Sequence, residues 1–267
     1  AVMGAVALSP SIAYRVNDDF SIGAGVSAVY TSFDQDIAVL QPGNADGRVS
    51  INQINDWGFT SFYGLTYQLN DKALLGVVYR PEFDAELEGD VNFSRFVGPT
   101  PTADDIEVDW TNPQVLQLGL QYKVNEEYTL FLDADWEDWS EFSDNQLAFK
   151  GGAVNPVVAV DRNWKDTYHV GAAVIRRWDD SQVSLGISYD SSPVDDDDRT
   201  FDLPIDEQLK VSASYAHTGE NLNYSIGATV AYMGDGKIDQ TAQGVRVKGE
   251  FDTNLVLFLG GTLRYEF

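Results

Sequence analysis

A strict two-residue alternation of apolar and small side chains is the feature that most constrains how this chain folds. Between Leu222 and Tyr232 the even positions carry Leu, Tyr, Ile, Ala, Val and Tyr, whereas Asn, Ser, Gly, Thr and Ala fill the odd positions. Successive side chains of a β-strand point to opposite faces, so this segment predicts a strand with one apolar face and one small or polar face. About eleven segments alternate in this way, which predicts an all-β, antiparallel fold.

The alternating segments extend over most of the chain and share the same end markers. They begin near Val6, Phe20, Trp57, Leu75, Leu116, Tyr128, Tyr168, Val183, Leu209, Leu222 and Leu255. Most apolar faces end in a tyrosine, and these residues are Tyr14, Tyr30, Tyr67, Tyr79, Tyr122, Tyr189, Tyr215, Tyr232 and Tyr265. Aromatic belts are typical of a barrel that spans a membrane, and small or polar residues on the second face suit its lumen. The pattern predicts a transmembrane β-barrel of outer-membrane type, with residues 1–267 as a single domain.

Composition and charge exclude several other classes of protein. The chain has no run of about 18 apolar residues, which a membrane-spanning helix requires. Its formal net charge of -25 disfavours nucleic-acid binding, because the phosphate backbone would be repelled. The sequence contains no cysteine, so it offers neither a disulfide framework nor a thiolate metal site. These observations leave a soluble protein or a membrane β-barrel. The aromatic end markers and the small or polar second face favour the barrel, and hence an outer-membrane location with membrane lipid and lipopolysaccharide as its surroundings.

Short and long connections alternate along the chain. Short polar segments at residues 16–19, 70–72, 125–127, 178–181 and 218–221 predict periplasmic turns. Longer segments rich in Gly, Pro and Asp at residues 39–55, 93–105, 151–161, 191–206 and 234–244 predict extracellular loops. With this alternation the first and last strands both run towards the periplasm, although complete bacterial barrels have an even number of strands. We therefore expect that the first strands and any plug domain precede this chain.

Four segments carry a resemblance to a known family. GISYDSSPVDDDDRTFDLP at residues 186–204 resembles the strand and loop near the C-terminus of the FadL family of long-chain fatty-acid transporters. DADWEDWSEF at residues 133–142 and RNWKDTYHVGAAV at residues 162–174 are similar to earlier segments of that family, in the same order. SIAYRVNDDFSIGAGVSAVY at residues 11–30 resembles a central hairpin. The similarity covers nearly the whole chain, which ends in LRYEF, with the terminal aromatic residue usual for such barrels.

The resemblance implies both a fold and a function. It implies a barrel of about fourteen strands, which an N-terminal hatch plugs. It also implies passive transport of long-chain fatty acids, which bind in an apolar pocket of the lumen and leave laterally through a gap in the wall. The family's hatch, its Asn-Pro-Ala signature and its kinked third strand lie N-terminal to the matched region, so none of them is carried over to this sequence.

A fatty-acid site needs an apolar channel for the tail and a cation for the carboxylate. Arg162 and Lys165 precede the strand that begins at Thr167, at its extracellular end, where family members use basic side chains near the acyl carboxylate. They are the candidate carboxylate ligands, unless they are ordinary loop cations paired with Asp or Glu. The candidates for the tail are bulky apolar residues at lumen positions, which could instead pack against a hatch. These are Val29, Phe62, Leu74, Val78, Phe131, Ile175, Val256 and Phe258.

The remaining charged residues at lumen positions favour a structural interpretation. Arg80, Lys210 and Arg264 are expected to pair with interior carboxylates such as Asp133, Asp135 or Glu266. The acidic run at residues 195–198 lacks the spaced ligands and the glycine of a calcium-binding loop, so it predicts a solvated loop and no metal site. No cofactor is expected. His169 and His217 fall at opposite ends of the barrel, and neither has an obvious nucleophile partner, so the sequence predicts no enzyme.

Rival functions in the same fold remain open. One is the import of aromatic hydrocarbons such as toluene, a second is general diffusion through a porin, and a third is a purely structural anchor. A porin constriction opposes rings of acidic and basic side chains, whereas this lumen has scattered charges and several bulky apolar residues. We therefore expect a monomeric outer-membrane transporter for long-chain fatty acids or another hydrophobic small molecule.

Overall fold

The computed structural model describes residues 2–41, 46–97, 102–152, 157–200, 205–242 and 245–265, and they form an almost purely antiparallel β structure. The strands are β1 (Val2–Leu8), β2 (Ser11–Arg15), β3 (Phe20–Leu40), β4 (Asp46–Asn70), β5 (Ala73–Arg80), β6 (Phe83–Ser94), β7 (Asp105–Asn112), β8 (Val115–Lys123), β9 (Tyr128–Glu137), β10 (Asp144–Lys150), β11 (Val157–Asp161), β12 (Thr167–Trp178), β13 (Ser181–Asp190), β14 (Gln208–Thr218), β15 (Leu222–Tyr232), β16 (Ile238–Ala242), β17 (Val245–Gly249) and β18 (Leu255–Tyr265). A short 3-10 helix, η1 (Trp139–Ser143), lies between β9 and β10. No helix among the described residues is long and apolar enough to cross a membrane.

Several strands are two halves of one pass through the sheet. The described passes are β1–β2, β3, β4, β5–β6, β7–β8, β9–β10, β11–β12, β13, β14, β15 and β18, which confirms the predicted number of about eleven. A proline stands at three of the breaks, namely Pro10, Pro81 and Pro113. Because proline has no backbone N–H, it removes a ladder hydrogen bond, and the strand pairing stops there.

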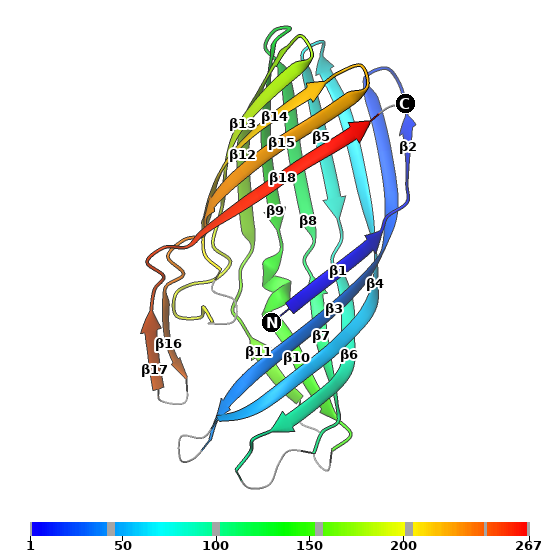
Figure 1. Ribbon diagram of the computed structural model, residues 1–267. Coiled ribbons are helices and arrows are strands. Elements are labelled where there is room, and N and C mark those ends of the chain that lie inside the picture. The colour runs from blue at the N-terminus through cyan, green and yellow to red at the C-terminus, as the bar shows by residue number, and fades with distance from the viewer. Residues whose placement is uncertain are drawn as a thin grey trace.

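The strands follow one another in a sheet that curls as a barrel wall does. At one end the order is β2-β3-β4-β5-β8-β9-β12-β13-β14-β15-β18, and at the other it is β1-β3-β4-β6-β7-β10-β11. In Figure 1, β18 and β1 pass in front of β8 and β9. All side chains of β1, β2 and β18 are exposed, because these strands are the edges of the described sheet.

The predicted short turns all lie at one end of the sheet, which we call the turn end. Three of them use the same device, in which an asparagine side chain accepts two backbone N–H groups further along the turn. Asn17, Asn70 and Asn125 each accept from the second and third residue after them, at 2.8–3.1 Å. Such local bonds favour a tight turn, so the turn positions predicted from the sequence are confirmed.

The opposite end, which we call the loop end, contains more strand than the sequence analysis predicted. The loops predicted at residues 39–55, 93–105, 151–161 and 234–244 are partly wrong, because β4, β11 and β16 occupy much of three of them and β3 and β6 reach into the first two. At Gln53, where φ is 52°, a bulge reverses which side chains of β4 face inwards. The alternation therefore changes phase there. The inward side chains of this extension form an apolar core of Val49, Ile51, Ile54, Ala85, Leu87, Val91, Ala103, Ile106 and Val108.

Candidate functional site

The two predicted carboxylate ligands, Arg162 and Lys165, lie on the segment that leads into β12 at the loop end. β12 pairs with β13 along its length, so the segment that follows β13 begins beside them. We call that segment the acidic loop (residues 191–200 and 205–206). The backbone N–H of Lys165 donates to the carbonyl of Pro193 at 2.8 Å. The structure therefore brings both cations to the same loop.

Side chains of the acidic loop contact the segment that carries these cations. Lys165 Nζ lies 2.5 Å from Asp195 Oδ1, and the two side chains are 52% and 72% exposed. Arg162 Nη1 donates to Thr200 Oγ1 at 3.1 Å, and the Asn163 amide donates to Asp198 at 2.9 Å. The acidic run is thus hydrogen-bonded to the protein, and not simply solvated as predicted.

An aromatic cluster lies directly beside these cations. Trp164, which stands between them in the sequence, is buried against Phe142, and their ring centroids are 4.8 Å apart. Trp110 of β7 and Trp139 of η1 contact the same Phe142 ring at 4.8 and 5.5 Å. Val194 of the acidic loop is buried in this cluster as well. The cluster itself is a buried core, and its half-buried neighbours Trp110, Trp139 and Ile205 are the apolar side chains that lie partly open beside the cations. An amphiphile with a charged head requires a cation next to apolar contacts of this kind.

The buried side chain of Arg199 holds the acidic loop in place. Its side chain is only 1% exposed and donates to Asp206 at 2.9 Å and to Asp196 at 2.7 Å. The same guanidinium also donates to the carbonyls of Val194 and Ile205, and to Ser192 and the Lys237 carbonyl. Since guanidinium is a rigid planar donor, these bonds hold the loop in one conformation. We call this set of hydrogen bonds the Arg199 lock.

The loop end is strongly acidic, and basic neighbours lower the pKa of two of its carboxyls, Asp239 and Asp36. Arg246 and then Lys248 donate to Asp239 in the β16–β17 hairpin and lower the pKa of that carboxyl to about 2. On β3, beyond the aromatic pair Tyr30 and Trp57, hydrogen bonds from the Arg48 side chain lower the pKa of Asp36. A negative field at this end repels free anions except where a cation is locally exposed.

The bulky apolar lumen candidates line the wall in small groups. Phe62 and Val78 lie on neighbouring positions of β4 and β5, since Gly64 is the register partner of Val78. The register also aligns Leu74, Gln121 and Phe131 across β5, β8 and β9. Ile175 lies on β12 one diagonal from Phe131, Val29 lies on β3, and Val256 and Phe258 lie on the edge strand β18. The structure therefore does not bring all eight into one pocket.

Phe62 sits in a depression that a glycine creates. Its ring covers Gly25 of β3, where an added Cβ would lie 2.2 Å from the ring. We expect Gly25→Ala to displace the ring and lower the free energy of unfolding by about 1–3 kcal/mol, as overpacked sites do. Gly119→Ala is the matched control, because a Cβ at this mid-strand position of β8 meets nothing within 4 Å.

The measurement for this pair is urea unfolding of the protein, as its gene encodes it, in lipid vesicles. In the double variant Gly25→Ala with Phe62→Ala, most of the loss should be recovered, since no ring then remains to collide. Equal stabilities of Gly25→Ala and Gly119→Ala would contradict the assignment of Phe62 to this depression.

Polar side chains of the inner wall form two sets of contacts, and the first crosses β9, β12, β13 and β14. His169 of β12 lies between Asp133 of β9 and Asp190 of β13, with both nitrogen-to-oxygen distances at 2.8 Å. Lys210 of β14 pairs with Asp190 at 2.8 Å. The predicted pairing of Lys210 with an interior carboxylate is therefore found, although the partner is Asp190 and not one of the residues named from the sequence.

The second set of contacts crosses β5, β8 and β9, and in it the cation reaches a carboxylate only through a glutamine. Arg80 of β5 donates to Gln117 of β8 at 2.6 Å, and Gln117 donates to Asp135 of β9 at 3.1 Å. The predicted pairing of Arg80 with an interior carboxylate is thus found only indirectly, because Gln117 lies between Arg80 and Asp135. Arg264 is described, whereas Glu266 lies outside the described residues. His217 contacts Ser181 at the turn end, so the two histidines lie at opposite ends as predicted.

The wall is interrupted between β4 and the pass formed by β5 and β6. The register of β4 with β5 ends at Tyr63 and Tyr79, and its register with β6 resumes at Asn55 and Glu88. Between these pairs, residues 56–62 of β4 lie opposite residues 80–87 of the β5–β6 pass, and no register pairs join the two stretches. The stretch in the β5–β6 pass is one residue longer than the stretch in β4. Pro81 stands in this stretch and cannot donate to the ladder.

Apolar side chains lie on both faces of this interruption. The Phe83 ring covers Gly58, where an added Cβ would come within 2.6 Å of it, on the face that Phe62 also shares. On the other face Phe59 is 73% exposed and helps to line a hollow of about 510 Å³. Thr60 Oγ1 donates to the Pro81 carbonyl at 3.4 Å, a long and weak contact. The backbone N–H of Glu86 also donates to Asp56 Oδ2 at 3.1 Å. Between residues 56–62 and 80–87 of the described chain, few polar contacts therefore hold the wall together.

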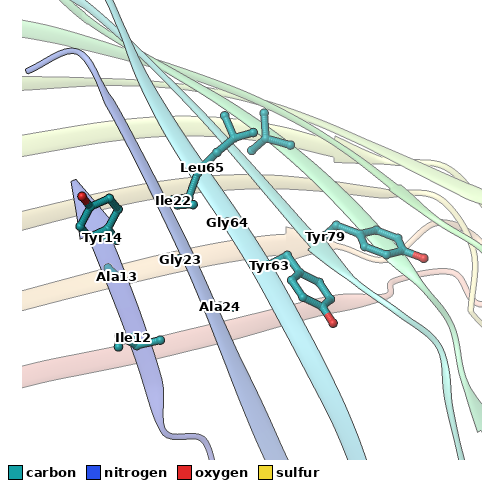
Figure 2. A pocket seen from close by; sticks show the side chains of 11 residues that line it. Ile12, Ala13, Tyr14, Ile22, Gly23, Ala24, Tyr63, Gly64, Leu65 and Tyr79 are labelled. Atoms are coloured by element: carbon teal, nitrogen blue, oxygen red, sulfur yellow. The ribbon is translucent and has the colours of Figure 1, made fainter. Parts of the chain in front are cut away.

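A second hollow on the outer face lies nearer the turn end (Figure 2). Its volume is about 480 Å³, and neighbouring strands β2, β3, β4 and β5 line it. The lining residues are Ile12, Ala13, Tyr14, Ile22, Gly23, Ala24, Tyr63, Gly64, Leu65, Val77 and Tyr79. The exposed apolar members belong to the stripe that the sequence assigns to lipid, so this hollow is a groove in the lipid-facing surface.

Sequence reasoning missed three features of the loop end. The aromatic cluster, the Arg199 lock and the wall interruption were not predicted. Trp139, Phe142 and Trp164 stand inside two of the four segments that resemble the FadL family, which is the signal that could have identified the cluster. The other two features depend on contacts between residues far apart in the chain.

Comparison with known proteins agrees with the fold and the resemblance. A family model described as outer membrane protein transport protein (OMPP1/FadL/TodX) matches residues 2–267. The long-chain fatty acid transport protein of Salmonella typhi is 24% identical over 255 residues, which cover 85% of this chain and 58% of that protein. This chain therefore spans somewhat more than half the length of that relative.

Solved structures share the fold at low sequence identity. A Pseudomonas aeruginosa FadL homologue superposes with a TM-score of 0.80 at 18% identity, covering 98% of this chain and 66% of that one. The Ralstonia pickettii toluene transporter TbuX superposes with a TM-score of 0.72 at 20% identity, covering 98% of this chain and 68% of that one. The predicted outer-membrane β-barrel fold is confirmed.

Proposed function

Because this chain belongs to the family of outer membrane protein transport proteins (OMPP1/FadL/TodX), we propose that it forms part of a passive route for long-chain fatty acids or similarly hydrophobic compounds across the outer membrane. The observation that carries this proposal is the combination of Arg162 and Lys165 with the aromatic cluster at the loop end. A fatty acid has a carboxylate for the cations and an alkyl tail for the half-buried side chains packed against the cluster. The inner-wall residues Val29, Phe62, Leu74, Val78, Phe131, Ile175, Val256 and Phe258 then offer apolar contacts to the tail inside the barrel.

Lateral release into the membrane is the second element of the proposal. The interruption between β4 and β5–β6 supports it, because an apolar molecule in the lumen would find apolar side chains on both faces and few polar contacts to break. A fully hydrogen-bonded strand pair would have to lose backbone bonds in an apolar medium, at a cost of several kcal/mol per group.

Import of aromatic hydrocarbons is the alternative function that a specific observation supports. The relative from Salmonella typhi is named as a transporter of long-chain fatty acids, whereas the TbuX structure is that of a toluene transporter. Toluene has no charged group, so it would gain nothing from Arg162 and Lys165. The two cations therefore favour the carboxylate-bearing ligand.

We expect the double variant Arg162→Gln with Lys165→Gln to weaken oleate binding by about 10- to 100-fold, since hydrogen bonds to a charged group contribute about 1.5–3 kcal/mol. The measurement is the half-saturation concentration for uptake of labelled oleate by a Gram-negative strain that lacks its own importer and makes the protein as its gene encodes it. Lys123→Gln, which removes a cation at the turn end of β8, is the control. An unchanged half-saturation concentration in the double variant would remove the carboxylate site from the proposal.

A further inference from the structure

The ammonium group of Lys165 is already occupied by a carboxylate. Among the described residues its side chain has one partner, Asp195 Oδ1 at 2.5 Å. Asp195 carries the same planar, singly charged group as a fatty acid. The pair therefore places a ligand-like carboxylate of the protein itself on a cation that the proposed function assigns to the ligand.

The structure presents Asp195 in a fixed position. The backbone N–H groups of Asp198 and Arg199 donate to the Asp195 carbonyl at 3.1 and 3.0 Å, which closes a turn around this residue. The buried Arg199 side chain then anchors that turn through Asp196 and Asp206. The Asp195 side chain is thus held beside Lys165 by the backbone, and no ordering of the loop is needed to form the contact.

The contact is nevertheless weak enough to be exchanged. Both side chains are more than half exposed, and ion pairs between exposed side chains contribute little to stability because water and salt screen them. An incoming carboxylate whose tail gains apolar contacts with the half-buried Trp110, Trp139 or Ile205 could therefore replace Asp195 on the ammonium group. The neighbouring Asp197 interacts electrostatically with Arg246, whereas the carboxylate on Lys165 is that of Asp195, so Asp197 does not compete in this way.

We propose that Asp195 is a specificity-determining residue that competes with the ligand carboxylate for Lys165. This inference rests on the proposed function, since it concerns the same cation. In the fraction of molecules in which Asp195 is paired with Lys165, an anionic ligand cannot use this cation. The apparent affinity for the ligand therefore falls in proportion to the fraction of molecules in which Lys165 is free. A neutral ligand does not use the cation, so Asp195 leaves its affinity unchanged.

Binding measurements on the purified protein, as its gene encodes it, test this competition with oleate and with oleyl alcohol, which has the same tail and no charge. Asp195→Asn is expected to tighten oleate binding by about two- to fivefold, the range that a surface ion pair allows, and to leave oleyl alcohol binding unchanged. The matched control is Asp197→Asn, which removes the same charge from the same run without touching Lys165. An equal gain for both variants, or an equal gain for both ligands, would overturn the proposal.

A double variant, Asp195→Asn in the Lys165→Gln background, separates loss of the competition from a general disturbance of the acidic loop. Without the ammonium group there is nothing to compete for, so adding Asp195→Asn to Lys165→Gln should give no further gain for oleate. A gain that persists in that background contradicts the competition. If Lys165→Gln alone leaves oleate binding unchanged, the carboxylate site of the proposed function fails. If Lys165→Gln weakens binding and Asp195→Asn has no effect, only the competition fails.

Discussion

Arg199→Met is expected to release the acidic loop while the barrel wall stays folded. Removal of the guanidinium leaves Asp206, which is buried, without its charge partner, and the carbonyls of Val194 and Ile205 lose their donor. Breaking a buried pair by removing one member costs about 3–5 kcal/mol. This corresponds to a population of the opened loop that rises by about two to four powers of ten.

Limited proteolysis of the loop, compared with hydrogen exchange in β13 and β14, measures this effect. The opened loop should be cleaved faster, whereas amide protection in the strands should not change, because the lock lies outside their register. Arg246→Met is the control, since it removes an exposed guanidinium that pairs with Asp239. If both variants leave the cleavage rate of the loop unchanged, Arg199 does not hold it.

Closing the interruption in the wall is expected to stop release of the ligand. Thr60 and Pro81 face each other there with one long contact, and the chain has no native cysteine. A short reversible thiol cross-linker between Thr60→Cys and Pro81→Cys should lower oleate uptake by about tenfold or more, as expected when a gating movement is blocked. Reduction of the cross-link should restore uptake.

The control for this experiment is a cross-link at an intact part of the same wall. Leu65 and Val77 are register partners on β4 and β5, so joining Leu65→Cys with Val77→Cys fixes strands that are already paired. Uptake should then stay at the level of the unlinked protein. If the cross-link at positions 60 and 81 also leaves uptake unchanged, the ligand leaves by another path, although the proposed carboxylate site would be unaffected.

Local patterns explain why the wall could be predicted from the sequence. The alternation of β15 and the asparagine turns at Asn17, Asn70 and Asn125 involve neighbours in the chain, so the sequence contains the whole signal. The prediction of the loop end failed because it relied on the same local patterns. The bulge at Gln53 changes the phase of the alternation, and the carboxylates along the outer face of β6 hide an inward face that includes Leu87.

The candidate site was predictable only in part because its geometry depends on distant contacts. Arg162 and Lys165 were identified by resemblance, yet Asp195 reaches Lys165 only because β12 and β13 pair and the loop folds back. Arg199 looks like any other exposed arginine in an acidic run until the Lys237 carbonyl and Asp206 are placed around it. Side-chain parity gave the inner-wall residues but not their grouping, since register joins residues such as Leu74 and Phe131 through a third strand.

The central claim is that the protein carries amphiphiles with a hydrophobic tail across the outer membrane. The most direct test compares the uptake of labelled oleate and of labelled toluene in one importer-deficient Gram-negative strain that makes the protein as its gene encodes it. Swelling of liposomes that contain the purified protein measures the passage of a small sugar alongside. We expect saturable uptake of oleate, weaker uptake of toluene and no swelling with the sugar, because the lumen combines bulky apolar residues with paired charges. Passage of toluene or sugar without oleate would contradict the account and leave only the barrel fold standing.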